Sequence, residues 1–209
     1  MRMYDCTTAP SPRRVRIFAA EKGLDLELVQ VDLRAGEQFS ATFRAINPDC
    51  VVPVLELDDG SHLTEIVAIC DYLEAIKPEP RLFGPDAAGH ATALMWNAKV
   101  EQQGLAAMQD AFRNTTRGLR GRAVTGPDGY EQIPELAERG LKRVAAFYRK
   151  LDARLAQAEY LAGDQFTIAD ISALVLVDFA AWMKVGIADD EYNLRRWYQN
   201  VSARPSASA

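Results

Sequence analysis

The sequence has few cysteines, no long apolar run and no excess of positive charge. Cys6, Cys50 and Cys70 form no CxxC pair and no metal-ligand spacing, which argues against a disulfide framework, predicts no metal site and suits a reducing compartment. No apolar stretch approaches the roughly 18 residues that a membrane-spanning helix needs, and residues 1–12 lack the apolar core of a secretory signal. We therefore expect a cytoplasmic protein without a membrane partner.

Charge and length limit the remaining classes of protein. Lys and Arg number 24 against 29 Asp and Glu, a formal net charge of -5 at pH 7, which disfavours a nucleic-acid partner. The 209 residues can form one large domain or two small ones. Arg13, Arg14 and Arg16 form a local basic cluster. This cluster is either the solvated first turn of a helix or the neighbourhood of an anionic ligand.

Residues 1–77 alternate between strand and helix patterns. They predict strands over 1–5, 26–33, 51–57 and 61–64, and helices over about 13–22, 36–46 and 66–76. Asp58-Asp59-Gly60 is a strong turn signal, so the last two strands form a hairpin and run antiparallel. Residues 1–80 are therefore predicted to form an α/β domain of order β-α-β-α-β-β-α with a mixed sheet.

A proline-rich connector separates this first part of the chain from a helical second part. Residues 81–86, which follow Pro78 and Pro80, are predicted to form a linker. Beyond them, helical patterns cover 87–116, 131–158, 167–185 and 193–201, with a glycine-rich break over 116–130. The sequence thus predicts an all-helical second domain over residues 87–209.

One helix start in the second part has a sharp signature. In Phe166-Thr167-Ile168-Ala169-Asp170-Ile171, a threonine stands at the N-cap position, an acid follows three residues later, and apolar residues flank both. This pattern is a capping box combined with a hydrophobic staple. We interpret it as a structural feature that starts a buried helix, with a cap contributing about 1 kcal/mol.

Two positions in the first part are either structural or bind a ligand. Pro53 is an ordinary edge proline, or it follows a cis peptide bond that presents the N–H and C=O of Val52 to a ligand. Glu65 begins a helix, where an acid complements the helix dipole. Alternatively, the N–H groups of that helix bind a ligand carboxylate while Glu65 binds an ammonium group.

Several motifs, in order, resemble the glutathione transferase family over nearly the whole chain. They are Asn47-Pro48, VPVLELDDG at 52–60, LTEIVAICDYLE at 63–74, LFGPD at 82–86, YLAGDQFTIADISAL at 160–174 and LRRWYQNVSARPS at 194–206. The chain resembles cytosolic, bacterial members with a serine-, nu- or theta-like first domain. The resemblance implies a thioredoxin-like first domain, an all-helical second domain, glutathione as co-substrate, a small-molecule electrophile and a homodimer.

The resemblance also implies roles for individual residues. The backbone of Val52, before a cis Pro53, would pair with the cysteinyl unit of glutathione. Glu65 and the backbone N–H of Ile66 would bind the γ-glutamyl end. Gln38 matches a position that often contacts the glycine carboxylate.

Three positions depart from the family's pattern. Ile66 replaces a serine whose hydroxyl would bind the γ-glutamyl carboxylate, an interaction of roughly 1.5–3 kcal/mol. Val51 stands where many members have a basic residue. Ala9 occupies the position of the catalytic serine in the pattern S-P-x-x-R-R-V-R.

The missing hydroxyl matters because the nucleophile is the thiolate of glutathione. A free thiol has a pKa of about 8.5, and one hydroxyl donor would lower that pKa by about one to two units. The N-terminus of the first helix, Arg13 or Arg14 could supply part of this effect. Ser11 and Thr8 are candidate replacements for the hydroxyl, or else they stabilise the turn. The position of Cys6 is more typical of the end of the first strand than of a redox-active residue.

The electrophile is expected to bind between the two domains. Met108, Phe112 and Trp182 are either core residues of the helical domain or walls of an apolar pocket. The leading hypothesis is an enzyme that adds the glutathione thiolate to an electrophilic apolar substrate. The alternatives are a non-catalytic protein that binds glutathione or another ligand, and a glutathione-dependent reductase that uses Cys6.

Overall fold

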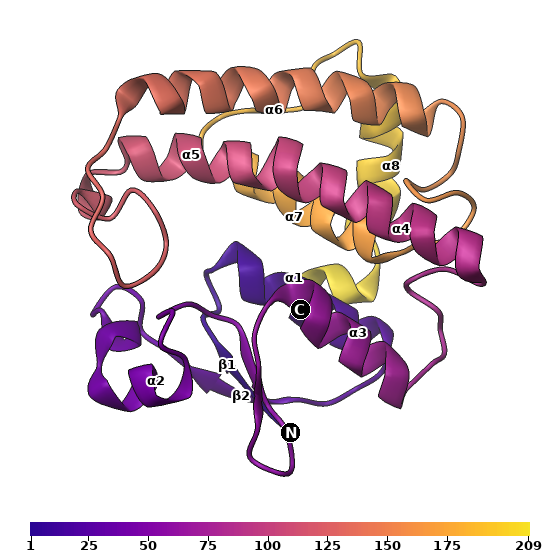
Figure 1. The fold of residues 1–209 in the computed structure, drawn as a ribbon. Coiled ribbons are helices and arrows are strands. Elements are labelled where there is room, and N and C mark those ends of the chain that lie inside the picture. The colour runs from indigo at the N-terminus through magenta and orange to yellow at the C-terminus, as the bar shows by residue number, and fades with distance from the viewer. The chain divides into compact units, whose positions relative to one another are not determined.

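The computed structural model describes residues 1–209, which divide into two compact units. The first unit contains Met1–Pro80 with Thr125–Asp128 and Ala209, and the second contains Arg81–Val124 with Gly129–Ser208. An α/β unit and an all-helical unit are present, so the predicted fold class is confirmed (Figure 1). None of the helices combines the length and the apolar character that crossing a membrane requires.

The first unit contains its strands and helices in the predicted order. They are β1 (Arg2–Asp5), α1 (Pro10–Glu21), β2 (Glu27–Gln30), the short helical turn η1 (Glu37–Phe39), α2 (Ala41–Ile46), β3 (Val54–Glu56), β4 (His62–Leu63) and α3 (Ile66–Ile76). The strand order is β2-β1-β3-β4, with β1 parallel to β2 and the other neighbours antiparallel. The sheet is mixed, as predicted. Its strands are shorter than the patterns suggested because only part of each run has a partner strand.

Both faces of this sheet are covered. Tyr4 and Val54 are paired across β1 and β3 and face α2. There the ring of Phe43 meets that of Tyr4 edge-on, with centroids 6.1 Å apart. Met3 and Leu55 point the opposite way, because successive strand residues alternate between faces, and neither is exposed. Helices α1 and α3, which pack against each other, cover that side.

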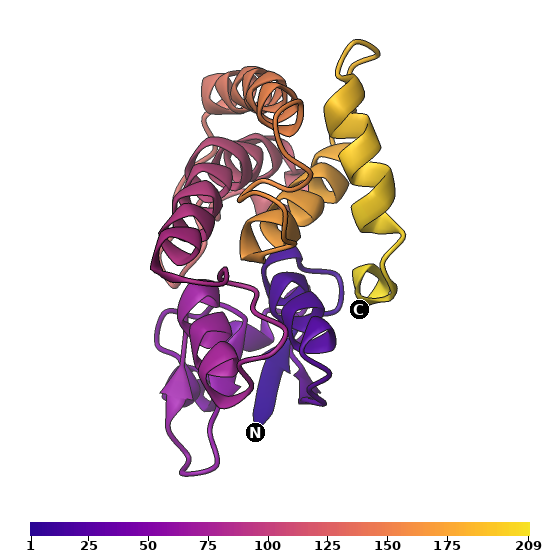
Figure 2. The same cartoon turned by 90° about the vertical axis from the view of Figure 1, so that its right-hand side faces the viewer.

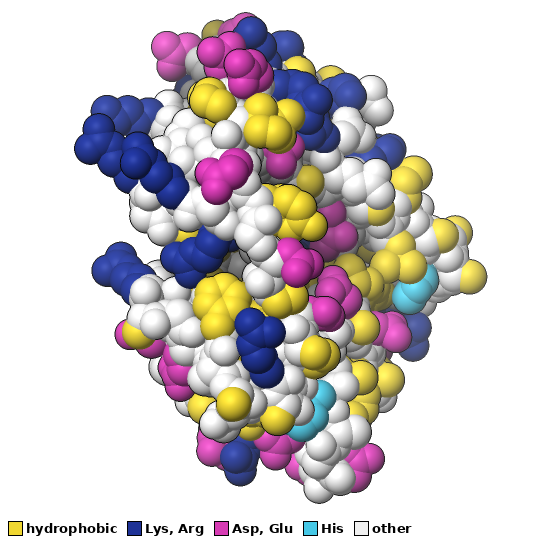
Figure 3. All heavy atoms as spheres, turned by 60° about the vertical axis from the view of Figure 1, so that its left-hand side comes forward, with side chains coloured by type: hydrophobic (Ala, Val, Ile, Leu, Met, Phe, Trp, Pro, Cys, Tyr) yellow, Lys and Arg dark blue, Asp and Glu magenta, His cyan; other side chains and the backbone are white.

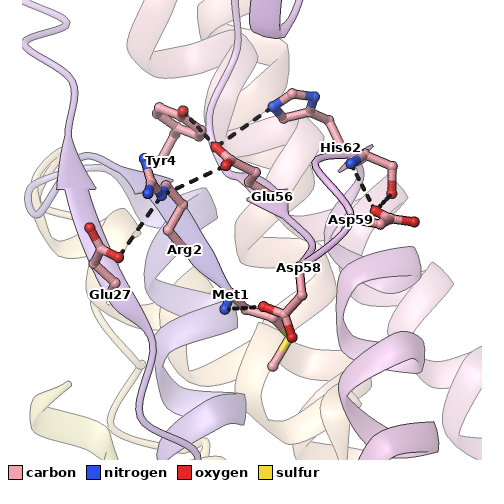
Figure 4. Close-up of polar contacts among 9 residues, drawn as sticks. Met1, Arg2, Tyr4, Glu27, Glu56, Asp58, Asp59 and His62 are labelled. Carbon is pink, nitrogen blue, oxygen red and sulfur yellow. Dashed lines mark hydrogen bonds and ion pairs between the residues drawn. The ribbon is translucent and has the colours of Figure 1, made fainter.

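A row of polar side chains, three of them charged, crosses the sheet at one register (Figure 4). Arg2 Nε lies 3.9 Å from Glu27 Oε2 on β2 and 3.8 Å from Glu56 Oε1 on β3. His62 Nε2 on β4 lies 3.9 Å from Glu56 Oε2, which also accepts a hydrogen bond of 2.8 Å from the hydroxyl of Tyr4. Opposite charges across neighbouring strands contribute about 0.2–1 kcal/mol each. The row therefore favours the observed register over a shifted one.

Helix α1 ends where the sequence predicts. Gly23 has a left-handed φ of 59°, which favours glycine, and its N–H donates to Ala20 O at 2.9 Å. The N–H of Leu24 donates to Ala19 O at 2.9 Å. These two bonds form a Schellman motif that satisfies the last carbonyl groups of the helix.

The second unit is built from long helices. They are α4 (Ala87–Lys99), the π-helical segment η2 (Val100–Leu105), α5 (Ala106–Thr115), η3 (Arg117–Leu119), α6 (Pro134–Leu155), α7 (Ile168–Ala181), α8 (Tyr192–Ser202) and η4 (Pro205–Ser208). The helix predicted over 87–116 is continuous, with η2 in its middle (Figure 1). Helix α5 packs against α6, and α8 packs against α6 and α7 (Figure 2).

Residues 81–86 belong to the helical unit and do not form a free linker. Leu82 and Phe83 are buried, and Leu82 O accepts a hydrogen bond of 2.9 Å from the N–H of Ile168. The ring of Phe83 stacks on His90, with centroids 5.5 Å apart. The sequence predicts a linker from proline and glycine content, whereas the two apolar side chains find cover among the helices.

Gly140 sets how closely α6 approaches α5. A Cβ at this position would lie 2.4 Å from the backbone oxygen of Ala107. We expect Gly140→Ala to lower the free energy of unfolding in urea by about 1–3 kcal/mol, because the helices must separate. Gly118→Ala is the control, since a Cβ there meets nothing within 4 Å. Equal stability of the two variants would show that the α5–α6 spacing is not tight.

Candidate functional site

The predicted ligand-binding residues of the first unit lie at the ends of its strands and helices. Thr8 and Ala9 precede α1 and Ser11 is in its first turn; Gln38 is in η1; Val52 and Pro53 precede β3; and Glu65 and Ile66 begin α3. Apart from Gln38, which is the middle residue of η1, they are at or next to element termini, where backbone groups lack partners within the helix or sheet.

The first turn of α1 has few hydrogen-bond donors. Ala9 is the N-cap residue, with φ -91° and ψ 135°, and its side chain cannot cap the helix. Pro10 and Pro12 carry no N–H. Ser11 therefore supplies the free backbone N–H of this turn, and its hydroxyl makes no hydrogen bond within the protein. An anion at this helix end could accept a hydrogen bond from this N–H group.

The hydroxyl of Thr8 is already close to a protein sulfur. Its Oγ1 lies 3.6 Å from Cys6 Sγ. Cys6 directly follows β1, as expected, and its carbonyl accepts a hydrogen bond of 2.8 Å from the N–H of Ala9. Of the two candidate hydroxyls, that of Ser11 is the one left without a local partner.

The peptide before β3 presents an unpaired backbone edge. The Val52–Pro53 bond is cis, so the cis alternative raised by the sequence is confirmed. Neither the N–H nor the C=O of Val52 has a hydrogen-bond partner in the structure. An extended ligand backbone can therefore form two hydrogen bonds with Val52.

Glu65 has an unusual backbone conformation. Its φ is 64° and its ψ 125°, a region that costs a residue with a side chain on the order of 1–3 kcal/mol. Its exposed carboxylate has no partner, and α3 has no side-chain cap, so the first N–H groups of that helix are open. The side chain of Ile66 is buried, which leaves only its N–H for a ligand. A carboxylate beside free helix N–H groups complements a ligand that carries both an ammonium and a carboxylate.

Gln38 is buried without a partner. Only 7% of the residue is exposed, and its Oε1 makes no hydrogen bond. Buried polar side chains are almost always hydrogen-bonded, so an orphaned one needs an explanation. A ligand carboxylate could accept a hydrogen bond from Nε2 of this amide as it stands, whereas Oε1 is itself an acceptor and needs a donor.

The three predicted pocket residues of the second unit differ in exposure. Met108 is fully buried in α5 and is a core residue, because the surrounding helices cover it completely. Trp182 is 53% exposed at the end of α7. Its ring lies 5.9 Å from Phe112 and 5.1 Å from Phe179, measured between centroids. Phe112 and Trp182 thus form an aromatic cluster that is still open to solvent, whereas Met108 does not.

Neither a metal-binding group nor a single large charged patch stands out elsewhere. No group of three or more His, Cys, Asp or Glu side chains is placed to hold a metal ion. On the face drawn in Figure 3, basic and acidic side chains occur in several separate groups and not as one field of a single sign.

Models of known families match both parts of the chain. Residues 8–76 match the N-terminal domain of glutathione S-transferase, and residues 91–205 match its C-terminal domain. Glutathione S-transferase 2 of Saccharomyces cerevisiae is 34% identical over 211 residues, which cover 99% of this chain and 87% of that protein.

Solved structures agree with these matches. The crystal structure of a glutathione S-transferase domain-containing protein from Marinobacter aquaeolei has a TM-score of 0.91, with 38% identity and 99% of each chain covered. That of Gtt2 from Saccharomyces cerevisiae has a TM-score of 0.90 at 33% identity, covering 99% of this chain and 98% of that one. With the matched domains and the site geometry, these likenesses show that the chain belongs to the glutathione S-transferase family.

Proposed function

We propose that this protein is a glutathione transferase that binds glutathione on its first unit and adds the thiolate to an electrophilic apolar substrate. The observation that carries the proposal is Glu65, whose unfavourable backbone conformation persists beside an unpaired, exposed carboxylate. Strain of this kind is typically retained at ligand sites. The γ-glutamyl end of glutathione carries an ammonium for Glu65 and a carboxylate for the N–H of Ile66.

The rest of glutathione matches the other open groups. Its cysteinyl backbone pairs with the N–H and C=O of Val52. Its glycine carboxylate accepts a hydrogen bond from Nε2 of Gln38. The electrophile contacts the aromatic cluster of Phe112 and Trp182. As is common in this family, we propose a cytoplasmic homodimer.

The reaction requires the thiol to lose its proton to water before it attacks. Ser11 donates to the sulfur through its hydroxyl and its N–H, and the positive end of α1 adds to this stabilisation of the anion. The sulfur lone pair then forms the bond to the electrophilic carbon, and any leaving group departs with the electrons of the broken bond. Ser11 thereby takes the role that a residue with a hydroxyl at Ala9 would otherwise have.

Ala9 favours a second candidate, a non-catalytic glutathione-binding protein. The two functions differ in the state of the bound thiol. Titration of glutathione into the protein, followed through thiolate absorbance across pH, separates them. A thiol pKa well below its ordinary value supports the transferase, whereas bound glutathione that titrates as in water supports the binding protein.

The same measurement tests the role of Ser11. We expect Ser11→Ala to raise the pKa of the bound thiol by about one unit and to lower kcat/KM about tenfold, because one hydrogen bond to the thiolate is lost. Thr8→Ala is the control and should behave as the wild type, since its hydroxyl is near Cys6. A larger effect of Thr8→Ala would transfer the role to Thr8.

A further inference from the structure

A closed ring of hydrogen bonds includes Thr7, which lies in the turn before α1. Asp5 is fully buried and accepts from Arg16 Nη1 at 2.5 Å and from Gln30 Nε2 at 2.6 Å. Gln30 Oε1 accepts from the N–H and the hydroxyl of Thr7, at 3.0 and 2.8 Å. Arg16 Nη2 donates to Thr7 O at 3.1 Å, which closes the ring.

The ring engages every polar group of Thr7, although this residue is exposed. An exposed loop threonine would ordinarily use water for these bonds. Here the end of β1, the middle of α1 and the edge strand β2 all connect to it. The turn from Cys6 to Ala9 follows at once, closed by the Ala9–Cys6 backbone bond. The ring therefore fixes where this turn delivers the first residues of α1.

We propose that this ring positions the loop that activates the glutathione thiol, with Gln30 and Thr7 as positioning residues for the transferase reaction. The inference rests on the function proposed above. Because Ala9 offers no hydroxyl, activation depends on the hydroxyl and N–H of Ser11, which is four residues beyond Thr7. Hydrogen bonds weaken steeply with distance and angle, and displacements of about 1 Å at a reacting centre have large kinetic effects. Because the protein offers few donors to the glutathione thiol, the pKa of that thiol should depend strongly on where the loop places Ser11.

Gln30→Leu tests the ring at a residue that is itself exposed, on the edge strand β2, while Asp5 keeps its bond to Arg16. The variant loses all three of the ring bonds made by Gln30. We expect the thiol pKa of bound glutathione to rise by about one unit and kcat to fall about tenfold. The glutathione Kd, measured below the thiol pKa, should stay within about twofold, since Gln38, Val52 and Glu65 are unchanged. If the ring only stabilised the fold, its loss would not raise the thiol pKa while leaving the glutathione Kd unchanged.

Thr7 supplies a matched pair of variants. Thr7→Val removes the hydroxyl at constant shape and should raise the thiol pKa, whereas Thr7→Ser keeps the hydroxyl and should restore the wild-type value. A wild-type thiol pKa in both Gln30→Leu and Thr7→Val overturns the inference. If Gln30→Leu does not fold, the Thr7 pair alone decides. A wild-type protein that binds glutathione without lowering its thiol pKa overturns the proposed function itself, and this inference with it.

Discussion

Replacing Asp170 with alanine is expected to lower the free energy of unfolding by about 3–5 kcal/mol. Asp170 is fully buried, and its carboxylate accepts four hydrogen bonds. Oδ1 accepts from Leu161 N at 3.0 Å and Trp197 Nε1 at 2.9 Å, and Oδ2 from Thr167 N at 3.0 Å and Thr167 Oγ1 at 3.1 Å. Each donor left buried without an acceptor costs about 1–3 kcal/mol. Urea unfolding measures the loss.

A milder variant measures the contribution of the capping hydroxyl apart from the rest of the Asp170 network. Thr167→Val removes only the Thr167 hydroxyl, which is one of the four donors to Asp170, so it should cost only about 1 kcal/mol. The capping box itself is present, as predicted. If Asp170→Ala lowers the free energy of unfolding by less than about 1 kcal/mol, the network does not hold the start of α7.

The same carboxylate makes stability depend on pH. Burial raises the pKa of Asp170 from 3.8 to about 6, although its hydrogen bonds act in the opposite direction. Between these two values the folded protein binds more protons at this site than the unfolded chain does. The contribution of Asp170 to the free energy of unfolding should therefore fall as pH rises from about 4 to about 6, by roughly 3 kcal/mol. The difference in urea stability between wild type and Asp170→Asn across this window measures it, and a difference independent of pH would contradict it.

Glu65→Gln is expected to weaken glutathione binding by about 10–100-fold, because a charge-assisted hydrogen bond contributes roughly 1.5–3 kcal/mol. The substitution keeps the shape and the backbone of Glu65 and removes only its charge. Isothermal titration with glutathione measures the change in Kd. Glu27→Gln, on the exposed edge strand β2, is the control for a general loss of negative charge.

Glu65→Gly tests whether the backbone strain is kept for the ligand. Glycine relieves a strain of about 1–3 kcal/mol and adds about 0.4–1 kcal/mol of flexibility to the unfolded chain, so the variant should gain about 1 kcal/mol of stability. It should bind glutathione as poorly as Glu65→Gln. A variant that is no more stable yet binds normally would show that neither the strain nor the carboxylate serves the ligand.

Much of the fold depends on short-range patterns and was therefore predictable. The order of strands and helices follows from apolar periodicity, the end of α1 from the glycine at position 23, and the start of α7 from the Thr167–Asp170 pair. The motifs around Pro53 and Glu65 also lie within short segments. Their chemistry is readable in the sequence because each depends on neighbours a few residues away.

The tertiary structure decided what depends on distant partners. Strand ends, the packing of residues 81–86 and the complete burial of Met108 follow only once other segments cover them. In the sequence, Gln30 is an ordinary strand residue. Only in the folded protein does it donate a hydrogen bond to Asp5, which lies 25 positions earlier. Hydrogen bonds between side chains act over about 3 Å whatever their sequence separation. The sequence by itself thus determined the elements, the family and most candidate ligand contacts. The fold determined which candidate hydroxyl is free, which residues are strained and which hydrogen bonds hold the loop before α1 in place.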